Sequence, residues 1–130
     1  MNPSLSLLVL RSADPERLAA FYAHLGMKFV KHRHGSGPEH FSAELGTGGV
    51  FEIYPLNAAD CPTTATRIGF CVDSVADACA DISLNGGRLV SAPKIGVWGM
   101  RAVLDDPEGH RIELTERKVD ADGSPTLHDA

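Results

Sequence analysis

The chain of 130 residues contains one pattern twice, and this internal repeat constrains the fold more than any other feature. The stretch LLVLRSADPERLAAFYAHLGMKFV begins at Leu7, and RIGFCVDSVADACADISLNGGRLV begins at Arg67. When the first stretch is shifted by 60 residues onto the second, Asp14 aligns with Ser74, and both residue types favour a helix N-cap. The same shift aligns Gly26 with Gly86, which would follow the two helix ends. Such a repeat predicts two equivalent structural units.

Apolar residues at helical spacing follow each of the two N-cap candidates. Pro15 occupies the first helical position, where its missing N–H is tolerated. The first helix then presents one apolar face, made of Leu18, Phe21, Tyr22 and Leu25. The second helix repeats the spacing, with Val75, Ala78, Cys79 and Ile82.

Strands are predicted before and after each helix, near 5–11, 27–33, 39–45, 48–56, 66–72, 88–92, 99–104 and 110–116. The fold class is therefore α+β: two tandem βαβββ modules, about 5–58 and 65–117, form a curved mixed sheet with an inner cavity. They lie in one domain, 1–118, and the polar end, 119–130, is predicted to be a flexible tail. The modules would pair within the chain or across a dimer.

Composition argues against several functional classes. The net charge is −5 and no basic patch is evident, so nucleic-acid binding is not expected. The early apolar run, 5–10, is too short for a membrane span or a signal segment. Three cysteines without CxxC spacing indicate reduced thiols in a cytoplasmic protein, with neither a disulfide framework nor a cysteine-based zinc site.

Strand alternation places two carboxylates on the sheet face away from the helices. Glu52 and Glu113 occupy equivalent positions of the repeat, and Leu7 and Arg67 are a second equivalent pair. Arg67 shares a face and a module with Glu113, so it is the expected partner of that carboxylate. Two interpretations stay open here: a lined pocket, or a solvated sheet face.

Several other residues have two possible roles. His32 and His34 share a strand face and His40 follows a turn; such histidines bind metals or are simply solvated, and the pattern specifies no further ligand. Trp98, flanked by glycines, would stack on a ligand while Arg101 anchors an anion, or it would cover the core.

Three nearby features are expected to have no catalytic role. His110 has the parity of a core residue, and Cys71 faces the cavity but has no activating neighbour. The stretch DDPEG (105–109) predicts a turn, because proline fixes φ and glycine supplies a positive φ.

The stretches SADPERLAAFYAHLGMKF, VDSVADACADISLNGGRL and DDPEGHRIELTE resemble the vicinal oxygen chelate superfamily. This superfamily includes glyoxalase I, bleomycin-resistance proteins and extradiol dioxygenases, and the spacing is most similar to bacterial glyoxalase I-like proteins. The resemblance covers about residues 5–117. It implies paired βαβββ modules and a homodimer.

The resemblance also implies where metal ligands would stand, namely at Leu7, Glu52, Arg67 and Glu113. Both carboxylates match. Leucine has no donor atom, and arginine is a permanent cation without a lone pair, so the metal site is predicted to be degenerate and no metal cofactor is expected. The alternative is a divalent ion such as Ni, Zn or Fe that Glu52 and Glu113 retain. Arg67 would replace the ion, bonding Glu113 and Glu52, or would bind an acidic ligand.

The predicted function is binding of a small organic ligand, acidic or aromatic, in the cavity. The alternative is a metal-dependent lyase or isomerase of glyoxalase type that uses Glu52 and Glu113, so enzymatic activity stays open. A third possibility is a scaffold in which Arg67 clamps the glutamates. The residues expected to line the cavity are Leu7, Val9, Glu52, Tyr54, Arg67, Trp98, Arg101 and Glu113.

Overall fold

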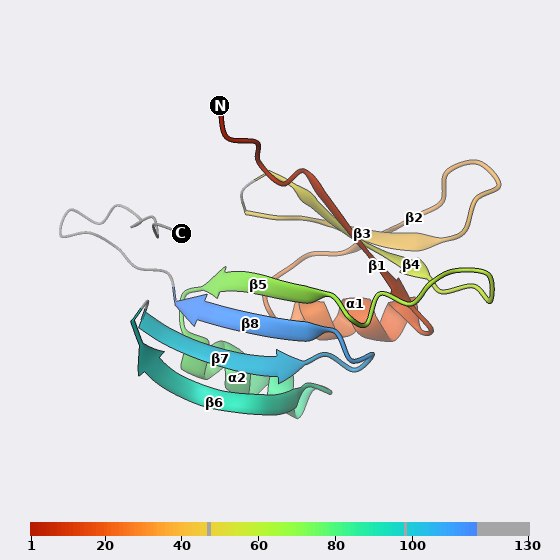
Figure 1. The fold of residues 1–130 in the computed structure, drawn as a ribbon. Coiled ribbons are helices and arrows are strands. Elements are labelled where there is room, and N and C mark those ends of the chain that lie inside the picture. The colour runs from red at the N-terminus through yellow and green to blue at the C-terminus, as the bar shows by residue number, and fades with distance from the viewer. Residues whose placement is uncertain (47, 98, 117–130) are drawn as a thin grey trace.

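A computed structural model describes residues 1–46, 48–97 and 99–116 of the chain. The order of elements is βαβββ, repeated once, as the repeat predicts (Figure 1). The first module contains β1 (Leu7–Ser12), α1 (Pro15–Ala23), β2 (Val30–His32), β3 (His40–Glu44) and β4 (Val50–Pro55). The second contains β5 (Arg67–Val72), α2 (Val75–Leu84), β6 (Arg88–Gly96), β7 (Gly99–Asp105) and β8 (Arg111–Glu116).

Each module builds its own four-stranded mixed sheet. The strand orders, β1-β4-β3-β2 and β5-β8-β7-β6, are the same arrangement twice. In both, the first strand pairs in parallel with the last, and the other pairs are antiparallel. Each helix packs on one face of its own sheet (Figure 1). The expected curved sheet is therefore divided into two sheets, and each leaves its second face free of a helix.

The helix boundaries follow the predicted capping residues. The side chain of Asp14 accepts a hydrogen bond from the backbone N–H of Arg17, and Ser74 accepts one from Asp77. Gly26 and Gly86 follow the two helices with φ values of 99° and 110°, which side chains of other residues rarely allow. The aligned caps and glycines are confirmed.

One apolar core lies between the helices and the sheets. On the strands, Leu10, Phe51, Ile53, Ile112 and Leu114 are fully buried. Tyr22 of α1 joins the modules, because its ring contacts Phe51 of β4 at 5.0 Å and Phe70 of β5 at 5.9 Å between centroids. The two modules therefore share a single hydrophobic core.

A buried carboxylate, Asp106, connects the turn before β8 to helix α1. It accepts hydrogen bonds from the Tyr22 hydroxyl at 2.6 Å, from His110 Nδ1 at 2.8 Å and from the backbone N–H groups of Glu108, Gly109 and His110. Burial, together with Asp106, raises the pKa of Tyr22 well above its ordinary value, so the phenol stays a neutral donor. The predicted turn and the structural role of His110 are confirmed.

Strand β6 is longer than the sequence predicts. Pro93 lacks a backbone N–H and would end a regular strand near residue 92. Instead the register with β7 shifts after Leu89 and again after Ser91, and pairing resumes at Lys94 with Arg101. These irregularities leave Pro93 out of the paired register and extend the strand to Gly96.

Two expectations from composition concern the whole chain. No helix in the described ranges is long and apolar enough to cross a membrane. All three cysteines, Cys61, Cys71 and Cys79, are free. The predicted tail, 119–130, lies outside the described residues.

Replacing Tyr22 with Phe tests the Asp106 connection. The variant removes the hydroxyl that donates to a buried carboxylate, so we expect the free energy of unfolding in urea to fall by about 1.5 to 3 kcal/mol. Tyr54→Phe is the matched control and should change it by less than about 0.5 kcal/mol, since no hydrogen bond of that hydroxyl occurs among the described residues. Equal losses in both variants would contradict the connection.

Candidate functional site

Glu113 lies at the centre of a charged cluster on the helix-free face of the second sheet. Arg67 Nη2 donates to Glu113 Oε1 at 2.5 Å, and Arg101 Nη2 donates to the same oxygen. In the register, Glu113 faces Gly69 on β5 and Val103 on β7. Each arginine is two residues from that facing position, a diagonal neighbour within reach of a long side chain. We call Arg67, Arg101 and Glu113 the arginine anchor.

The arginine anchor has an excess of positive charge. Hydrogen bonds from Arg101 and from Arg67 lower the pKa of Glu113, so this carboxylate is ionised. Two guanidinium groups against one carboxylate leave one net positive charge. The Arg67 side chain is 52% exposed, so part of its guanidinium remains open to an incoming anion.

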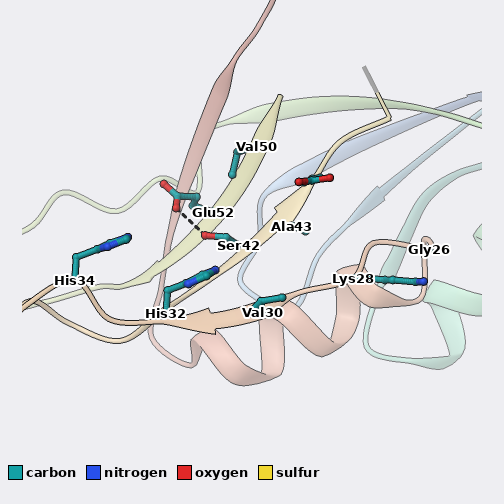
Figure 2. Close-up of a pocket in the computed structure, with 10 residues that line it drawn as sticks. Gly26, Lys28, Val30, His32, His34, Ser42, Ala43, Val50 and Glu52 are labelled. Carbon is teal, nitrogen blue, oxygen red and sulfur yellow. Dashed lines mark hydrogen bonds between the residues drawn. The ribbon is translucent and has the colours of Figure 1, made fainter. Parts of the chain in front are cut away.

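A hollow of about 610 Å³ lies on the helix-free face of the first sheet (Figure 2). In it, the Ser42 hydroxyl on β3 donates to Glu52 Oε2 on β4 at 2.7 Å. Figure 2 shows His32 and His34 toward one end and Lys28 toward the other. Among the described residues, the lining comes only from the first module: Gly26, Lys28, Val30, His32, His34, Ser42, Ala43, Glu44, Val50 and Glu52.

The described structure does not gather the predicted ligand-binding residues into one cavity. Of that set, only Glu52 lines the hollow, whereas Arg67, Arg101 and Glu113 form the arginine anchor on the other sheet. The predicted pairing of Arg67 with Glu113 is present. No contact of Arg67 with Glu52 occurs within the described ranges.

Two further predicted residues, Leu7 and Tyr54, have other surroundings. Leu7 is half exposed on β1, where it pairs with Val50. Tyr54 stacks on His40 with ring centroids 4.2 Å apart, and the Arg11 guanidinium lies 5.1 Å from its ring centroid. Trp98 lies outside the described residues, so its two proposed roles stay open.

The four positions at which the resemblance implies metal ligands do not fit a metal ion. Leu7 offers no donor atom, and the guanidinium at Arg67 would repel a cation. The carboxylate of Glu113 is already engaged by two arginines. In the described part of the chain, no three His, Cys, Asp or Glu side chains form a group that could hold an ion as they stand.

Of the polar residues of the hollow, the sequence patterns identify Glu52, His32 and His34 but not the others. Lys28, Ser42 and Glu44 were not identified, although alternation along β3 places Ser42 and Glu44 on the face of Glu52. Strand alternation along β3 is therefore the signal in the sequence that predicts Ser42 and Glu44 on this face. No local pattern in the sequence predicts the burial of His40, because that burial depends on Tyr54 of another strand.

Comparisons with known proteins agree with this architecture. The family model of the glyoxalase/bleomycin resistance protein/dioxygenase superfamily matches residues 4–114. A lactoylglutathione lyase of Salmonella typhimurium is 31% identical over 121 residues, covering 85% of this chain and 90% of that protein.

Two solved structures show the same fold at low sequence identity. A glyoxalase-related enzyme from Fulvimarina pelagi has a TM-score of 0.73 and 21% identity, covering 98% of this chain and 100% of that one. An antibiotic binding protein from Streptomyces sp. CB03234 has a TM-score of 0.68 and 20% identity, covering 88% and 96%.

The titration of Glu113 tests the arginine anchor. Its side chain should titrate below the ordinary value of 4.5 in carboxyl NMR, and Arg101→Met should raise that pKa. A pKa lowered in the folded state stabilises the fold above the ordinary pKa, and this stabilisation is lost as the pH falls through the folded-state pKa. In Arg101→Met the free energy of unfolding should therefore fall less steeply as the pH drops below about 4.5.

Arg33→Met is the control, since Arg33 pairs with Glu39 on the first module. It should leave the Glu113 titration unchanged. An ordinary Glu113 pKa in the unsubstituted protein would contradict the anchor.

Proposed function

The chain belongs to the glyoxalase/bleomycin resistance protein/dioxygenase superfamily, and on that basis we propose that it binds a small organic ligand, acidic or aromatic, at its inner sheet faces. We further propose that the metal position implied by the family pattern is degenerate and has become a site for an anion. One observation carries this proposal: Glu113, at a ligand position, is held by Arg67 and Arg101.

The chemistry of the arginine anchor favours an acidic ligand. Each guanidinium has five N–H donors in a planar fork, and Glu113 Oε1 occupies one nitrogen of each. The remaining donors match the two oxygens of a carboxylate in a bidentate pair. The Streptomyces structure described as an antibiotic binding protein is a precedent for ligand binding on this fold, although its likeness extends to the fold alone.

We also propose that two copies form a homodimer that completes the cavity. The described residues that line the hollow all belong to the first module, while the arginine anchor belongs to the second. Leu7 and Val30, on the first sheet, are 51% and 56% exposed, so a partner chain that covers this sheet would bury apolar surface. A cytoplasmic location stays a prediction that agrees with three free cysteines.

Lyase or isomerase activity is the second candidate function, favoured by the 31% identity with a lactoylglutathione lyase. It would rely on Glu52 and Glu113. Turnover of a hemithioacetal with added Ni²⁺, Zn²⁺ or Fe²⁺, lost in Glu113→Gln, would support it and reject the degenerate site. No turnover with any of the three ions would reject the metal-dependent enzyme.

Replacing Arg67 with Leu separates ligand binding from a purely structural clamp. If Arg67 binds a ligand, the affinity for 2-naphthoate should fall at least about tenfold, the value of one lost charge-assisted contact. Stability should fall by no more than about 1 kcal/mol, because the pair is partly exposed and Arg101 still holds Glu113. Calorimetric titration and urea unfolding measure the two effects.

Two controls sharpen this experiment. The neutral 2-naphthamide should bind much more weakly than the acid, and Arg33→Leu should leave 2-naphthoate binding unchanged. Sedimentation equilibrium of the same samples should give the mass of two chains. Failure of 2-naphthoate to bind would contradict an acidic aromatic ligand, and a large loss of stability in Arg67→Leu would favour the clamp.

A further inference from the structure

Three histidines come together at one end of the hollow, next to Glu52. His32 on β2 pairs with His40 on β3, and His34 lies two residues after His32 in the sequence. The ring centroid of His40 lies 5.1 Å from that of His34 and 5.9 Å from that of His32. We call His32, His34 and His40 the imidazole cluster. The sequence pattern offered only His32 and His34 on one face, and the fold supplies the third ring.

The ring of His40 contains a buried nitrogen without a hydrogen-bond partner. The side chain is 1% exposed, and Nε2 has no partner. Nδ1 lies 3.3 Å from the carbonyl oxygen of Pro38, which only accepts, so Nδ1 carries the proton in the neutral ring. The lone pair of Nε2 then faces Glu52 Oε2 at 3.5 Å. Two acceptors directed at each other are unfavourable, and either a proton on Nε2, which would give an ion pair, or a bound cation between them removes the conflict.

The spacing of these donors suits a tetrahedral ion. Two ligands about 2.1 Å from a tetrahedral Zn²⁺ are about 3.4 Å apart, close to the observed separation of His40 Nε2 and Glu52 Oε2. Two imidazole rings bound to one such ion have centroids about 5 Å apart, close to the separation of His34 and His40.

His40 and Glu52 are also held in place by hydrogen bonds with other groups. His40 is held through Nδ1 by the carbonyl of Pro38, and Glu52 is held by the hydroxyl of Ser42. Outer partners of this kind orient metal ligands in proteins.

We propose that the imidazole cluster and Glu52 together bind one transition-metal ion of the Zn²⁺ type. The present side chains do not converge on such an ion, so His32 and His34 must rotate to complete the site. Both residues are exposed. This site shares Glu52 with the positions implied by the family pattern but uses neither Glu113 nor Leu7, and it does not depend on the proposed anion binding.

Titration of tag-free protein with ZnCl₂ tests the site. We expect one Zn²⁺ per chain by calorimetry, confirmed by metal analysis after gel filtration. The double variant His32→Gln, His34→Gln should weaken binding at least about a hundredfold, because even an outer partner of a metal ligand contributes about 10- to 100-fold. Both residues are exposed, so this variant should fold normally, whereas the buried His40 is a less suitable target.

Two control variants identify the ligands. His24→Gln removes an exposed histidine that pairs with Asp81 of the second module and does not line the hollow, so it should leave Zn²⁺ binding unchanged. Glu113→Gln should also leave it unchanged. No Zn²⁺ binding, or full binding in the double histidine variant, would overturn the inference. Binding lost only in Glu113→Gln would instead place the ion at the family positions and would reject the degenerate site as well.

Discussion

The arrangement of the two modules depends on one buried carboxylate. Asp106 lies in the turn before β8 and is fully buried, so its charge requires several donors. It receives them from its own turn and from Tyr22 on the helix of the other module. The adjacent Glu108 accepts from the backbone N–H of Ala13 and pairs with Arg17, which fixes the start of α1 on the same turn. These bonds hold the helix of the first module against the turn that precedes β8 in the second module.

The repeat is regular in backbone and irregular in side-chain chemistry. The residues aligned with Tyr22 and His110 are Ile82 and Gly49, so the buried polar connection has no equivalent in the other half. At Gly49 a Cβ atom would lie 2.6 Å from the carbonyl oxygen of Leu5, so that position excludes a histidine for steric reasons. The two modules are thus equivalent in topology, but they contribute different side chains to the contact between the modules and to the inner sheet faces.

The parts of the structure that could be predicted depend on local periodicity. Helix caps, strand parity and the pairing of Arg67 with Glu113 follow from neighbours within one module, where side-chain direction is fixed by the backbone period. The separation of Glu52 from Arg67 depends on how two sheets are oriented, which no period encodes. The buried environment of His40 likewise arises from Tyr54 and Glu52 on another strand.

The two carboxylates at equivalent positions have different electrostatic surroundings, and this difference decides what each inner face can bind. Glu113 pairs with two guanidinium groups, so its face carries an excess of positive charge. Glu52 has a neutral hydroxyl and an imidazole nitrogen beside it, so its negative charge remains available to a cation. If the two glutamates had the same neighbours in both modules, both inner faces would favour the same sign of charge. The presence of arginines beside the carboxylate in one module alone therefore gives the two inner faces different local charge.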